Sequence, residues 1–150
     1  MNGRILLIVG GWMSAAASFL HIAVIVGGPD WYRFFGAGEQ MARMAERGDA
    51  YPAIVTTLIA LILAIWAAYA FSGAGLIRRL PLLRTGLITI SAIYLLRGLI
   101  LVPILFLSDV PATPFTIWSS LIVLAYGFAY AAGTWLSWPA LRPNGGSIAT

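Results

Sequence analysis

Four long apolar stretches dominate this chain of 150 residues. They cover approximately residues 5–26, 52–74, 85–107 and 114–137. Each is long enough to cross the hydrocarbon core of a bilayer as a helix, which takes about 20 residues. Membrane strands would alternate in polarity and be about half as long. The sequence therefore predicts an all-α, polytopic membrane protein, a four-transmembrane-helix bundle that forms a single integral membrane domain over residues 1–150.

The composition agrees with this fold class. Hydrophobic residues make up 61% of the chain and charged residues only 9%, whereas soluble domains carry about 25% charged residues. The net charge of +4 is spread over short connections rather than along one stripe, so the bilayer is the expected partner and nucleic acid is not. The first apolar run begins like a signal peptide but continues past its alanine patch, and we expect it to be an uncleaved span.

The arginines predict the orientation of the spans. Arg4 precedes the first span, three arginines lie within residues 78–84, and Arg142 follows the last span. The connection between the third and fourth spans carries only Asp109, and residues 27–50 carry mixed charges. Because basic connections stay in the cytoplasm, we expect a multi-pass protein of the cell inner membrane. Its N- and C-termini would be cytoplasmic and the loop 27–50 external.

Several classes of chemistry are excluded. The chain has no Cys and one His, so it cannot by itself build a disulfide, a thiolate site or a His-rich metal centre. It contains no HExxH, P-loop, GxSxG or dinucleotide-binding motif. We therefore assign no catalytic residue, metal site or cofactor, and expect a binding protein rather than an enzyme.

Arg97, near the middle of the third span, is the residue most informative about function. Arginine at mid-membrane costs at least about 2.5 kcal/mol, so it should face the bundle interior or a wet cavity. Tyr94 lies one turn earlier on the same face. Pro103 cannot donate to the carbonyl of Leu99, which predicts a kink. Two interpretations stay open: backbone carbonyls hold Arg97 to fix the bundle, or Arg97 binds an anionic ligand.

Further polar residues extend this candidate site. His21 continues the Ser18 face of the first span, slightly nearer the outside than Arg97. Such groups often only pair with each other or with carbonyls, and that alternative stays open. The candidate ligand-binding residues are Arg97, His21, Tyr94, Ser18, Tyr126 and Tyr130.

The external loop 27–50 is too long and too aromatic for a simple connector. Residues 39–47 are predicted to form a short amphipathic helix at the membrane interface. We interpret the loop as a gate in which Asp30 or Glu39 approaches His21 or Arg97; the alternative is an interfacial helix with solvated charges. The candidate gate residues are Asp30, Trp31, Arg33 and Glu39.

Packing within lipid is expected to use close approach of small residues. Small residues repeat every four positions in three spans: Gly10, Ser14 and Ser18; Ala60, Ala64 and Ala68; Ala125, Ala129 and Gly133.

Residues from about 139 to 150 are expected to form a disordered tail.

The leading functional hypothesis is a small inner-membrane protein that binds a small anion or lipid headgroup in an outward-facing polar pocket, as an accessory subunit or minor transporter. One alternative is a membrane-embedded enzyme acting on a lipid or isoprenoid, with His21 as acid and base. Another is a structural partner of a larger complex. The expected partners are the bilayer, an anionic or lipid ligand, and a second copy or a larger membrane complex.

Overall fold

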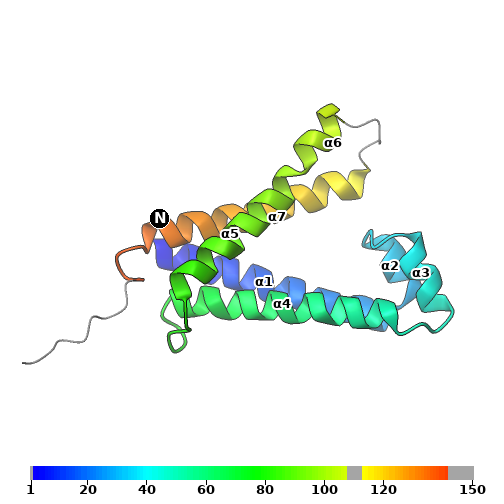
Figure 1. Cartoon of the computed structure of the whole chain (residues 1–150), viewed down its shortest axis with the longest axis horizontal. Helices are drawn as coiled ribbons and strands as arrows, with labels where there is room; N and C mark the ends of the chain where they lie inside the picture. The colour runs from blue at the N-terminus through cyan, green and yellow to red at the C-terminus, as the bar shows by residue number, and fades with distance from the viewer. Residues whose placement is uncertain (1, 108–112, 142–150) are drawn as a thin grey trace, which may run out of the picture.

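The computed structural model describes residues 2–107 and 113–141. Four of its helices are long and apolar enough to span a membrane, the third of them continuing to Pro103. The chain is therefore a small all-α, multi-pass membrane protein built as a four-helix bundle. The elements (Figure 1) are α1 (Gly3–Gly27), α2 (Pro29–Phe34), α3 (Glu39–Glu46), α4 (Tyr51–Gly73), α5 (Leu83–Leu99), α6 (Leu101–Leu107) and α7 (Pro114–Leu136).

The long helices pack as two pairs. α1 lies along α4, α5 lies along α7, and α1 joins the pairs through α7. α4 and α5 are close where their connection joins them and diverge toward the other end (Figure 1). The N-terminus and the α4–α5 connection lie at one end of the bundle, hereafter the termini end. α2, α3 and α6 lie at the other, the cap end.

The third span is divided into two consecutive helices by one turn residue, Ile100. We expected one helix over residues 85–107, but α5 ends at Leu99 and α6 begins at Leu101. Pro103 has no N–H to donate to the carbonyl of Leu99, and its ring crowds the preceding turn. The disturbance predicted at Leu99 is therefore present in the structure.

The connection between the first two spans holds two short helices rather than one. The predicted helix is present as α3, whereas α2 was not predicted. The sequence of α2 nevertheless carries ordinary helix-forming features: Pro29 in the first turn, Asp30 near the N-terminus of the helix and Arg33 in its last turn. Glycines with positive φ (70° to 97°) flank both helices: Gly28, Gly36, Gly38 and Gly48.

The prediction of small-residue packing faces is only partly correct. Gly10 and Ser14 of α1 are buried as expected, but Ala64 of α4 and Ala125 of α7 are exposed. A strict spacing of four drifts by about 40° per step around an α-helix, whereas alternating spacings of three and four follow one face. The buried face of α4 shows that alternation: Thr56, Ala60, Leu63, Ala67 and Ala70.

The core lies among all four long helices. Leu7, Leu87 and Tyr130 are fully buried in it. Leu141 belongs to the same core, and its carbonyl accepts a hydrogen bond from Arg79. Leu141, which lies within the stretch expected to form a disordered tail, is therefore buried at the termini end. Residues 142–150 lie outside the part that the structure describes.

Candidate functional site

A chain of buried hydroxyls crosses the middle of the bundle. Ser14 Oγ lies 2.8 Å from the Tyr94 hydroxyl and 2.8 Å from the Tyr130 hydroxyl. Tyr130 donates to the carbonyl of Trp66 at 3.0 Å. Since a carbonyl only accepts and each hydroxyl has one proton, the direction is fixed. Tyr94 donates to Ser14, Ser14 donates to Tyr130, and Tyr130 donates to Trp66.

Aromatic rings pack around this chain of hydroxyls. The Tyr94 ring lies edge-on to Trp66 and Tyr126, with centroids 4.8 Å and 5.3 Å away. The structure thus brings together the three tyrosines predicted for the site. It adds Ser14, which the sequence interpretation assigned only to packing. Tyr94 and Tyr130 are buried and bonded to Ser14, so they join α1, α4, α5 and α7 rather than face an opening.

Ser18 and His21 bond to backbone. Ser18 donates to the carbonyl of Ala60 at 2.8 Å, tying α1 to α4. His21 Nδ1 lies 2.7 Å from the carbonyl of Ala17 on its own helix. Because that carbonyl only accepts, Nδ1 carries the proton, and Nε2 of the neutral ring is an acceptor. His21 is half-buried.

Arg97 continues the inward face of α5. Leu87, Ile90 and Tyr94 on this face are buried, and Arg97 follows at the same helical spacing. Arg97 itself is exposed, because α5 diverges from α4 toward the cap end (Figure 1). We expected an enclosed guanidinium or one lining a wet cavity. Its Nη1 lies 3.5 Å from Ser120 Oγ of α7, at the long limit of a hydrogen bond.

His21 occupies the corresponding place on α1. It continues the face of Leu7, Gly10 and Ser14, which are all buried. The two predicted residues therefore share the inward side of the cap half, but the described structure does not join them by a hydrogen bond.

Arg33 organises the ion pairs of the residues that were predicted to form a gate. Its guanidinium lies 2.9 Å from Glu39, 2.6 Å from Glu46 and 3.3 Å from Asp30. Arg43 adds a second contact to Glu39 at 3.0 Å. Hydrogen bonds from Arg33 and then from Arg43 lower the pKa of Glu39 to about 2, and the same carboxylates raise the pKa of Arg33.

This cluster corrects one expectation. Asp30 and Glu39 were predicted to approach His21 or Arg97, but the structure pairs both carboxylates with Arg33. Residues close in sequence on two adjacent short helices meet at little entropic cost, since only a short loop is closed. The unpredicted α2 is what presents Arg33 to α3.

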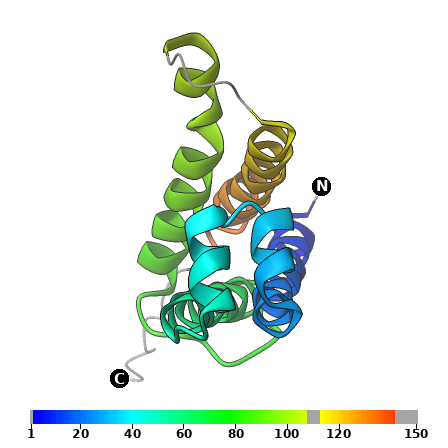
Figure 2. The same cartoon turned by 90° about the vertical axis from the view of Figure 1, so that its right-hand side faces the viewer.

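The two short helices and the loop that joins them (residues 29–46), hereafter the cap, cover the ends of α1 and α4 (Figure 2). Tyr32 of α2 is buried and accepts a long hydrogen bond from Thr56 of α4 at 3.4 Å. Gly36 lies so close to α7 that an added Cβ would be 2.3 Å from the ring of Phe115. The Trp31 ring packs against Phe35 within the cap, with the two ring planes tilted by 47°. The cap therefore touches both helix pairs.

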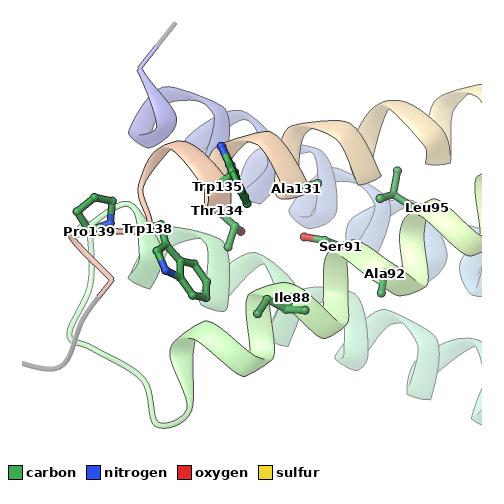
Figure 3. A pocket seen from close by; sticks show the side chains of 9 residues that line it. All are labelled: Ile88, Ser91, Ala92, Leu95, Ala131, Thr134, Trp135, Trp138 and Pro139. Atoms are coloured by element: carbon green, nitrogen blue, oxygen red, sulfur yellow. The ribbon is translucent and has the colours of Figure 1, made fainter.

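A groove of about 680 Å³ lies between α5 and α7 in the half of the bundle nearer the termini end (Figure 3). Its walls are apolar apart from two hydroxyl side chains, Ser91 and Thr134. The sequence interpretation did not identify it, because no residue type marks a groove between two apolar helices. The lining residues are Ile88, Ser91, Ala92, Leu95, Ala131, Thr134, Trp135, Trp138 and Pro139.

No family model, curated protein or solved structure matches this chain. Function must therefore be argued from the chain's own geometry.

Proposed function

We propose that this small multi-pass membrane protein binds a small anion or the anionic headgroup of a lipid in the cap half of the bundle. One observation carries the proposal: Arg97 lies on the inward face of α5 within a membrane span, yet is exposed. A guanidinium in hydrocarbon is costly unless water or an anion accompanies it. Its planar, five-donor group suits phosphate or carboxylate.

Neighbouring polar groups support an anion at this position. Ser120 of α7 lies beside the guanidinium, and His21 Nε2 is an acceptor on the inward face of α1. A protonated phosphate oxygen could donate to this Nε2, while a protonated His21 would add positive charge. Tyr126 is half-buried at the edge of the tyrosine cluster and adds a hydroxyl. In this proposal Tyr94 and Tyr130 do not contact the anion; they hold the helices around the site together through Ser14.

The cap would control access to the site. It contacts α4 through Tyr32 and α7 through Gly36. Gly28 and Gly48, both with positive φ, flank it. Arg33 and its carboxylates would hold the cap together as one unit when it moves.

Thermal unfolding of the detergent-purified protein tests the proposal, with inorganic phosphate and short-chain dihexanoyl phosphatidate as separate probes. We expect stabilisation of the wild type and at least about tenfold weaker binding in Arg97→Gln, because a charged hydrogen bond contributes roughly 1.5–3 kcal/mol. Stabilisation by phosphate alone indicates a small anion; stabilisation only by phosphatidate indicates a lipid headgroup.

Arg47→Gln is the matched control. Arg47 is an exposed arginine at the same end whose described ion pair is with Asp49 alone. It removes one positive charge without touching the inward faces, so it should bind as the wild type does. Equal binding by wild type and Arg97→Gln would overturn the proposal.

A further inference from the structure

The α5–α7 groove has the shape of a site for a hydrocarbon chain. Small residues, Ala92 of α5 and Ala131 of α7, open its walls, and Ile88 and Leu95 make them apolar. The groove lies between two membrane-spanning helices. An alkyl chain fits such a surface, because it fills the space at no polar cost.

One buried polar group lines the groove without a partner. Thr134 is only 5% exposed, and among the described residues its Oγ1 has no hydrogen-bond partner. Ser91, on the opposite wall (Figure 3), already donates to the carbonyl of Leu87 at 2.7 Å. Threonine in a helix occupies two rotamers, and rotation about Cα–Cβ exchanges its hydroxyl and methyl groups. The hydroxyl can therefore turn to an acceptor in the groove.

The rim of the groove is positively charged. Arg84 lies over the Trp138 ring, with Cζ 4.3 Å from the centroid, and donates to the Trp138 carbonyl at 2.8 Å. Its Nε is enclosed and has no hydrogen-bond partner among the described residues. Arg4, Arg78 and Arg79 belong to the same end. The acidic residues of the described part lie elsewhere, in the cap and its connection to α4.

We propose that the groove binds one anionic phospholipid. The acyl chain would lie between α5 and α7, an ester carbonyl would accept from Thr134, and the phosphate would lie at Arg84 beside Trp138. Thr134 lies in the last turn of α7, and Trp138 follows two residues beyond the end of the helix. The ester and the phosphate of a phospholipid follow each other in the same sense, across an interfacial layer about 5–7 Å deep on each side of a bilayer. A second copy fits the rim less well, since it would bring the same positive charge.

The charged rim of this site, at Arg84, lies at the opposite end of α5 from Arg97, and the site does not depend on the function proposed above. Its test is binding of dioleoyl phosphatidylglycerol and dioleoyl phosphatidylcholine to the purified protein in detergent. We expect the wild type to bind the anionic lipid at least tenfold more tightly. Arg84→Gln should abolish that preference, whereas Arg84→Lys should keep most of it.

Two further variants test the contacts proposed for the acyl chain and for the ester carbonyl of the lipid. Ala92→Phe projects a ring into the groove from an exposed position and should weaken binding of both lipids at least tenfold. Thr134→Val should weaken both about fivefold, the effect of one neutral hydrogen bond. Without lipid it should be no less stable than the wild type, because the hydroxyl it removes has no described partner.

Arg47→Gln, at the cap end, should leave the lipid preference unchanged. Retention of that preference in Arg84→Gln, or wild-type lipid binding by Ala92→Phe, would overturn the proposal. A change in oligomeric mass of Ala92→Phe with unaltered lipid binding would also overturn it and assign the groove to a second copy.

Discussion

Ser14 shows how far residue type alone can predict a site. Its spacing with Gly10 predicts a packing face, and it is fully buried. Its partners could not be predicted, because Tyr94 and Tyr130 lie 80 and 116 residues away in sequence. The tyrosines were correctly identified as a polar group in the bundle. Which of their hydroxyls are already bonded depends on helix rotation, which an apolar sequence hardly constrains.

Removal of the Ser14 hydroxyl should destabilise the bundle. Ser14→Ala leaves Tyr94 without its acceptor and Tyr130 without its donor, in a site that water does not reach. We expect a loss of roughly 1–3 kcal/mol in the free energy of unfolding, measured by unfolding in mixed detergent and SDS micelles. Ser119→Ala, which loses only a contact to the Thr116 carbonyl on its own helix, should change little. An equal effect of both substitutions would contradict this assignment.

The Glu39 carboxyl should titrate far below its ordinary range. Its pKa is lowered from 4.5 to about 2 by Arg33 and Arg43. A lowered pKa in the folded state means that the contribution to cap stability is complete above about 4.5 and is lost as pH falls toward 2. NMR titration of the Glu39 carboxyl should therefore give a midpoint near 2. Arg33→Gln should move this midpoint up; a wild-type midpoint near 4.5 would contradict the ion cluster.

Among the elements, α5 and α7 approach each other closely at two glycines. An added Cβ at Gly98 would lie 2.8 Å from the Leu124 backbone, and one at Gly127 2.8 Å from the Leu95 side chain. From the sequence, Gly98 could be predicted only to give the backbone local conformational freedom. Its contact with Leu124 depends on how α5 and α7 pack, which the sequence does not reveal. Backbone approach of this kind is how helices associate where lipid is as apolar as the side chains.

The face of α4 can be tested with one residue pair. Ala67 is buried and Ala64 is exposed, although both lie in the same helix and are three residues apart. Ala67→Leu should destabilise the bundle by about 1–3 kcal/mol through overpacking, and Ala64→Leu should be nearly neutral. Unfolding in SDS micelles measures both. Greater damage from Ala64→Leu would restore the strict four-residue ridge predicted from sequence.

For the whole molecule, the spans could be predicted because bilayer thickness fixes their length. Their pairing could not, since every long helix is apolar around most of its circumference. The start of α1, the end of α7 and the arginine-rich α4–α5 connection share one end (Figure 1), which fits an even number of spans. The sequence predicted that Arg97 lies on the inward side of its helix. It could not predict that Arg97 is exposed, because this exposure depends on the divergence of α5 from α4.

The most direct test of the account is whether water reaches residue 97. The chain has no cysteine, so Arg97→Cys places a single thiol there, and Leu96→Cys is the control on a neighbouring position that is 70% exposed. Thiols react as thiolates, which require water. In proteoliposomes, a membrane-impermeant sulfonated thiosulfonate should modify Arg97→Cys from the cap side and leave Leu96→Cys unmodified. If Arg97→Cys is as unreactive as Leu96→Cys, residue 97 faces hydrocarbon and the proposed anion site is wrong.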